Sequence, residues 1–286
     1  MERLVDILPP DLHDGLRPEW MIEIPEWAFT PDDWTFAFQR GLRTIQWGRR
    51  LVWEVGVGTG INAIVARARN PHMRLRISDL SPRVTELAVE NLRRTVGLEN
   101  VEVLNGSWDL VTDRRESCAE IGKVDAVVAC IPQVPMRGMD LSVCDLMAHY
   151  YNPERYTDSP MHDLGLGLND SLLIRAHHVL VAGGHTVLNL CGRPGLNRLV
   201  QMFDRRGYTP RELHRGIIPQ HIQTSIASLA ELEVQGHSDF EFFSDMGGRD
   251  RIDAYTAEER RLRCLAEERA SDIYHAIYVI EGVLRT

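Results

Sequence analysis

Residues 54–60 read Glu-Val-Gly-Val-Gly-Thr-Gly, and they follow the apolar run Leu51–Trp53 and precede a helix-like stretch at 61–68. Glycines at alternate positions let the backbone turn sharply and approach a ligand that a Cβ atom would keep away. A helix that begins directly after such a turn directs its free N–H groups and positive dipole end at the ligand. The stretch therefore predicts a strand, a ligand-binding loop and a helix, with a nucleotide-like molecule bound at the loop.

The spacing of the glycines narrows the class of nucleotide. A dinucleotide fingerprint needs a third glycine where this chain has Ile61, and no P-loop pattern occurs. Two acids accompany the loop instead: Glu54 starts it, and Asp79 ends the next apolar run, 75–80. An acid about 20 residues after such a loop commonly binds ribose hydroxyls. The alternative is a glycine-rich turn without a ligand, which two acids at this spacing make the weaker interpretation.

At these residues the chain resembles the class I S-adenosylmethionine (SAM) methyltransferases, whose first motif is an acid followed by G-x-G-x-G and whose second is an acid ending the second strand. The resemblance implies SAM as cofactor or substrate. Ser107 stands where the family often has an acid that binds the adenine amino group, which weakens that assignment. The SAM-binding residues that the resemblance implies are Trp34, Glu54, Gly56, Gly58, Thr59, Gly60, Asp79, Leu80, Ser107, Trp108, Cys130, Ile131 and Pro132.

Composition limits the other classes of function. With 286 residues and a net charge of −9, the chain has room for one α/β domain with extras and lacks the basic footprint of a nucleic-acid-binding protein. Its five cysteines are scattered and include no C-x-x-C pair, so neither disulfides nor a metal site are expected. No secretion signal and no apolar run of 18 residues occurs, so we expect a cytoplasmic protein with no membrane partner. A small-molecule substrate is the expected partner, and a homodimer remains open.

From residue 51 strand-like and helix-like segments alternate, which predicts a doubly wound α/β fold. Combined with the resemblance, the expected fold is a Rossmann-like, seven-stranded, mostly parallel sheet. An N-terminal cap segment would span 1–47 and a SAM-binding catalytic domain 48–286, with an insertion at about 133–168. The expected strands are 51–55, 75–80, 101–104, 124–131, 185–190, 217–218 and 227–234; a helix over 172–180 would end at 182–184, and the apolar segment 273–283 would dock on the core.

The N-terminal segment is rich in aromatic residues. Seven of the 20 aromatic residues of the chain fall between Trp20 and Trp47. A helical cap over the ligand and a flap packed on the sheet explain this density equally well.

The segment after the fourth strand bears on the acceptor. Nitrogen-directed methyltransferases carry [N/D]-P-P-[FYW] there, whereas this chain has Cys-Ile-Pro-Gln at 130–133, so a stacked planar acceptor is not expected. This segment, the glycine loop and the segments 31–36, 191–195 and 240–243 together resemble the N-terminal catalytic domain of plant methionine S-methyltransferases, over most of the chain. As a free-standing form the chain is also similar in architecture to the SAM-cyclising azetidine-2-carboxylate synthases.

Three hypotheses follow from these resemblances. The preferred one is cyclisation of SAM to azetidine-2-carboxylate with release of methylthioadenosine. The first alternative is methyl transfer to sulfur or nitrogen of methionine or a related small amino acid, and the second is a non-catalytic SAM-binding partner protein. Candidate catalytic residues, which would hold the sulfonium or accept a proton, are Tyr150, Tyr151, Tyr156 and Asp163. Arg193 is interpreted as a surface arginine in preference to a carboxylate-binding residue.

Overall fold

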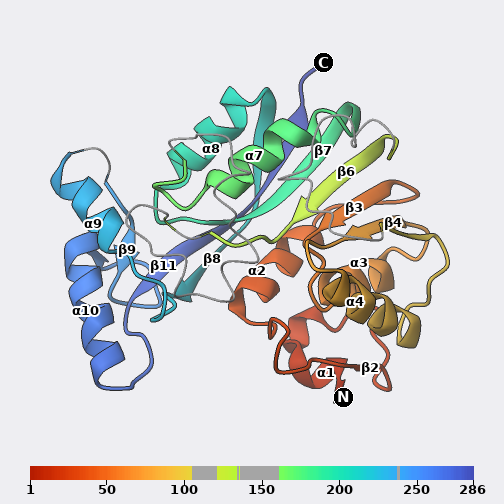
Figure 1. Ribbon diagram of the computed structural model, residues 1–286, viewed down its shortest axis with the longest axis horizontal. Helices are drawn as coiled ribbons and strands as arrows, with labels where there is room; N and C mark the ends of the chain where they lie inside the picture. The colour runs from red at the N-terminus through yellow and green to blue at the C-terminus, as the bar shows by residue number, and fades with distance from the viewer. Residues whose placement is uncertain (105–120, 134, 136–160, 237–238) are drawn as a thin grey trace.

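A computed structural model describes residues 1–104, 121–133, 135, 161–236 and 239–286 (Figure 1). Five predicted site residues lie outside these ranges: Ser107, Trp108, Tyr150, Tyr151 and Tyr156. Their roles stay predictions, and so does most of the predicted insertion at 133–168.

The described residues form one large mixed sheet. Its strand order is β10-β9-β11-β7-β6-β3-β4-β5, and β8 pairs with β11 outside this path. The pairs among β3 to β7 are parallel, whereas β11 runs antiparallel to both β7 and β8. The strand bounds are β3 Leu51–Val55, β4 Arg74–Ser78, β5 Val101–Val103, β6 Val124–Ala129, β7 Leu180–Cys191, β8 Tyr208–Pro219, β9 Phe242–Phe243, β10 Arg251–Ile252 and β11 Tyr274–Leu284.

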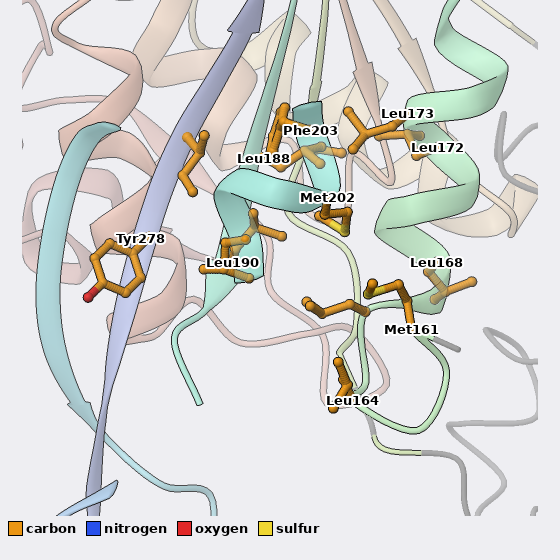
Figure 2. Close-up of a cluster of buried hydrophobic side chains, with 14 of the residues drawn as sticks. Met161, Leu164, Leu168, Leu172, Leu173, Leu188, Leu190, Met202, Phe203 and Tyr278 are labelled. Atoms are coloured by element: carbon orange, nitrogen blue, oxygen red, sulfur yellow. The ribbon is translucent and has the colours of Figure 1, made fainter. Parts of the chain in front are cut away.

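Helices cover both faces of this sheet, as the alternating pattern predicts. On one face α7 and α8 pack over β6 and β7, where Leu172, Leu188 and Phe203 belong to one cluster of buried side chains (Figure 2). On the other face α2, α3 and α4 form a second core with Val52 and Val128 of the strands. The helix bounds are α2 Asp33–Leu42, α3 Ile61–Arg69, α4 Pro82–Arg94, α7 Gly167–Ala176, α8 Leu196–Arg205, α9 Ala227–Val234 and α10 Ala254–Ala266.

The N-terminal segment packs on the sheet through α2. Asp32 starts this helix with a capping box that includes Thr35. Phe38 is fully buried, and a Cβ on Gly41 would lie 2.4 Å from Val279 of β11, so the helix approaches the sheet closely. Before α2 the chain forms a small two-stranded sheet, β1 Glu2–Arg3 with β2 Met21–Ile22, and the short helices α1 Leu4–Ile7 and η1 Pro10–Leu12. The α2 part thus matches the flap alternative, and the division at residue 47 stays a prediction.

Three expectations are wrong in detail. The sheet has nine strands rather than seven among the described residues, because the two-residue strands β9 and β10 extend it. The segment 227–234 is the helix α9, and its buried residues Leu229 and Leu232 follow helical spacing. Residues 182–184 lie within β7 instead of ending a helix: α7 ends at Ala176, and the glycine pair accommodates a bulge where β7 changes register against β6.

No helix in the described part of the chain is long and apolar enough to cross a membrane.

Candidate functional site

The glycine loop connects β3 to α3 at the carboxyl edge of the sheet. Gly56, Gly58 and Gly60 all have positive φ, 70°, 55° and 82°, which disfavours other residues there. The backbone N–H groups of Gly56 and Val57 donate to the Ser78 carbonyl, at 3.0 Å each, so the loop is held against the end of β4. A Cβ on Gly60 would lie 3.2 Å from Cα of Ala88, and this glycine therefore lets α3 pack closely on α4.

Asp79 joins the loop to the start of α4. Its carboxylate accepts hydrogen bonds from Gly58 N (3.1 Å, Oδ2) and Ser81 N (3.0 Å, Oδ1), and the side chain is buried. The carboxylate therefore lies at the same edge of the sheet as the glycine loop. Leu80, which follows it, is half-buried. This is the geometry that the spacing of Asp79 from the loop predicts.

Asn91 of α4 fixes Thr59 of the loop, a role that sequence reasoning missed. Its Nδ2 donates to Thr59 O and to Glu23 O, both at 2.9 Å, and its Oδ1 accepts from Glu23 N at 2.8 Å. A signal existed, because residue 91 falls on the buried face of α4, three residues after Ala88. The amide ties the loop and the N-terminal segment to one helix.

Glu54 differs from Asp79 in its environment. It is 2% exposed and lines a small cavity with Asn62 of α3 and Trp47. Burial raises the pKa of Glu54 to about 8, although a hydrogen bond with Asn62 opposes the shift. Gln39 of α2 donates to Asn62 Oδ1 at 3.2 Å and so extends this buried chain. Glu54 is therefore a neutral carboxylic acid at pH 7, and direct contact between it and a ligand stays a prediction.

The segment after β6 lies against the glycine loop. A Cβ on Gly56 would lie 3.2 Å from Cγ2 of Ile131, and Pro132 beside it is half-buried. The Nδ2 atom of Asn189 donates to Trp34 O at 2.9 Å and to Cys130 Sγ at 3.2 Å. The structure thus brings the predicted residues Trp34, Cys130 and Ile131 to the same edge as the loop.

Arg193 is buried, contrary to its interpretation as a surface arginine. It is 2% exposed, and its Nε and Nη2 donate to Cys191 Sγ (2.7 Å) and Gln133 O (2.8 Å). Gln133 in turn donates to Asn189 O at 2.6 Å and accepts from Cys191 N at 2.7 Å. The turn after β7 folds inward because these groups hold the guanidinium, and a single sequence gives no sign of that.

Asp163, the one predicted catalytic residue that the structure describes, lies in the turn before α7 and is half-buried. It has no hydrogen bond or ion pair with any described residue, so the structure does not connect it to the loop. The described residues also hold no group of three side chains suited to a metal ion.

The strand order and the glycine loop define a class I methyltransferase fold: the parallel order 3-2-1-4-5 of a doubly wound sheet, with the loop at its switch point. Among known proteins, the chain is distantly similar to methionine S-methyltransferases. That of Zea mays is 28% identical over 261 residues, and that of Hordeum vulgare is 27% identical over 261 residues; each alignment covers 83% of this chain and 24% of the relative. The chain thus spans about a quarter of the length of these relatives.

No known family profile matches the chain. Among solved structures, a precorrin-6y C5,15-methyltransferase from Geobacter metallireducens is similar with a TM-score of 0.46 and 12% identity, over 94% of this chain and 96% of that one.

Proposed function

We propose that the chain is a SAM-dependent methyltransferase that acts on the sulfur of methionine or a closely related amino acid. The observation that carries SAM binding is the loop geometry: three left-handed glycines beside a buried carboxylate, Asp79, that accepts a hydrogen bond from the loop. The similarity to methionine S-methyltransferases over 83% of the chain supports the acceptor. This similarity favours methyl transfer, whereas cyclisation is the preferred hypothesis from the sequence alone.

The chemistry needs little activation, because the methyl carbon on a sulfonium is already electrophilic. A thioether lone pair attacks that carbon, the carbon–sulfur bond of SAM breaks, and neutral S-adenosylhomocysteine leaves while the acceptor becomes a sulfonium. No proton moves. The protein must align nucleophile, carbon and leaving sulfur and exclude water. We propose that Trp34, whose backbone carbonyl accepts from Asn189, offers its aromatic face to the sulfonium, a contact of about 0.5–2 kcal/mol.

Incubation with methyl-labelled SAM, with and without methionine, tests the proposal. We expect S-adenosylhomocysteine and labelled S-methylmethionine only when methionine is present. Methylthioadenosine from SAM alone would show cyclisation instead, and tight SAM binding without turnover would show a non-catalytic binding protein. The Asp79→Asn variant should lose SAM affinity, whereas Asp253→Asn, at the exposed start of α10, should not.

A further inference from the structure

A line of buried and half-buried polar groups lies near the start of α2, along the carboxyl ends of β6 and β7. We call it the edge cluster; its members are Asp32, Cys130, Gln133, Asn189, Cys191, Arg193 and His275. Hydrogen bonds connect its central members, from Cys130 through Asn189 and Gln133 to Arg193. One end of the edge cluster is positively charged and the other is rich in oxygen acceptors. The hydrogen bonds described above for the glycine loop go to neither end.

The positive end is Arg193. No carboxylate among the described residues lies within ion-pair distance of this buried guanidinium, and its Nη1 has no acceptor there. Burial alone would raise the pKa of the Cys191 thiol, but Arg193 and His275 outweigh it and lower that pKa to about 7. A thiol of this kind is only partly ionised at neutral pH. Because a buried cation without a full counter-charge is costly, the site favours an anionic ligand.

The negative end consists of Asn189 and Asp32. Asn189 is fully buried, and its Oδ1 has no hydrogen-bond partner in the part of the chain that the structure describes. Asp32 Oδ1 accepts from Trp34 N (3.0 Å) and Thr35 N (3.3 Å), whereas its Oδ2 has no partner among the described residues. Burial raises the pKa of Asp32, which a bound cation would reverse. Both side chains are tied to Trp34, Asn189 through the Trp34 carbonyl and Asp32 through the Trp34 N–H. Two oxygen acceptors without partners among the described residues suit an ammonium group, which only donates.

The spacing between the two ends fits one small zwitterion. Asn189 and Cys191 point to the same face of β7, about 7 Å apart along the strand, and the guanidinium lies on Cys191. In an α-amino acid the nitrogen and the carboxyl carbon are joined through Cα by bonds of about 1.5 Å each. Adding a hydrogen bond of about 2.8 Å at each end gives a total reach of about 8 Å. The length of an α-amino acid is therefore similar to the separation of these two strand positions.

We propose that the edge cluster is an amino-acid subsite, in which Arg193 binds the α-carboxylate and Asn189 with Asp32 binds the α-ammonium group. This proposal rests on the proposed function for the source of the amino acid: the free acceptor or the amino-acid part of SAM. Gln133 contributes by holding Arg193 and both strand positions in place.

The test uses two variants with matched controls. Arg193→Lys keeps the charge but loses the planar fork, and Asp32→Asn removes a charge while keeping an equally good helix cap. The controls are Arg205→Lys on the exposed face of α8 and Asp253→Asn at the exposed start of α10. Steady-state kinetics with methionine and its methyl ester, and calorimetry with S-adenosylhomocysteine and methylthioadenosine, provide the readouts.

We expect Arg193→Lys and Asp32→Asn to raise the KM for methionine about tenfold or more with a smaller change in kcat, and the controls to leave it unchanged. Wild type should discriminate against the methyl ester, and Arg193→Lys should narrow that discrimination, which a purely structural role would not do. If the variants instead weaken the binding of S-adenosylhomocysteine and leave that of methylthioadenosine unchanged, the bound amino acid is that of the cofactor. If both variants leave the KM for methionine and the affinity for S-adenosylhomocysteine unchanged, the proposed subsite is wrong.

The two proposals fail differently. If wild type binds no S-adenosylhomocysteine, the proposed function is wrong, and calorimetry with methionine alone still tests the edge cluster. If Arg193→Lys unfolds, Asp32→Asn decides the question, because its helix cap is preserved.

Discussion

Glu54 should make the protein less stable as the pH rises through neutrality. Its folded-state pKa is raised by burial from 4.5 to about 8, so between these values the folded protein keeps a proton that the unfolded chain releases. The stability associated with this group is therefore fully present below pH 4.5 and is lost progressively up to pH 8. The Glu54→Gln variant, which cannot ionise, should not show this loss.

The size of the effect follows from the linkage between pKa and folding. Each pH unit between the two pKa values corresponds to 1.36 kcal/mol. Wild type thus loses about 3 kcal/mol by pH 7 and about 5 kcal/mol at most by pH 8. These are large fractions of the roughly 5–15 kcal/mol that stabilise a typical protein. A buried glutamine amide adds a constant offset, so the slope against pH is the diagnostic quantity.

Urea unfolding of both proteins between pH 5 and pH 8.5 measures the slope. Glu281→Gln is the matched control, because Glu281 is equally buried at 2% exposed but its pKa is lowered by hydrogen bonds with His185 and Arg211. The stabilisation by Glu281 is present above pH 4.5 and is lost as the pH falls through the lowered pKa. Glu281→Gln should therefore have a smaller free energy of unfolding than wild type at neutral pH. A constant difference between wild type and Glu54→Gln over the whole range would refute the argument, since it would mean that Glu54 is already ionised.

Two further predictions concern the loop. Gly60→Ala should destabilise the protein more than Gly58→Ala. Both positions have positive φ, which costs about 1–2 kcal/mol for a residue with a Cβ atom, but only the Cβ at 60 would meet the backbone of Ala88, at 3.2 Å. Equal losses of unfolding free energy in denaturant titrations would contradict this prediction. Asn91→Leu should weaken S-adenosylhomocysteine binding about tenfold in calorimetry. The reason is that the backbone groups of Thr59 and Glu23 lose hydrogen-bond partners worth about 1–3 kcal/mol each. An unchanged affinity would show that the loop holds its shape without this amide.

The sequence predicts the positions of the glycine loop and of Asp79 because the signals for them are local. Alternate glycines after an apolar run specify the β3–α3 turn, and the acid at residue 79 follows from the spacing of one strand–helix–strand unit. The start of α4 at Pro82 follows from the fixed φ of proline. Each of these features depends on residues within about 30 positions of one another.

The edge cluster could not be predicted because its contacts are long-range. Arg193 is buried only because the segment around Gln133, 60 positions earlier, meets it, and His275 approaches Cys191 from β11. The glycine pair at 183–184 is typical of a helix end, yet here it forms a bulge that pairing with β6 imposes. A single sequence contains no record of which turn meets which, so an arginine in a Gly-Arg-Pro-Gly turn looks solvent-exposed.

Helix α2 connects the glycine loop and the edge cluster. At its start Asp32 provides one end of the edge cluster, and Trp34 O accepts the hydrogen bond that orients Asn189. Two turns later Gln39 hydrogen-bonds Asn62, the partner of Glu54 beneath the glycine loop. A shift of α2 would therefore change the acceptors at the edge cluster and the environment of Glu54 together. If Asp32 binds the ammonium group of the free acceptor, occupancy of the subsite should fix α2. Methionine should then raise the affinity for S-adenosylhomocysteine, and S-adenosylhomocysteine should raise the affinity for methionine by the same factor. If the subsite holds the amino-acid part of the cofactor, the two ligands should compete instead.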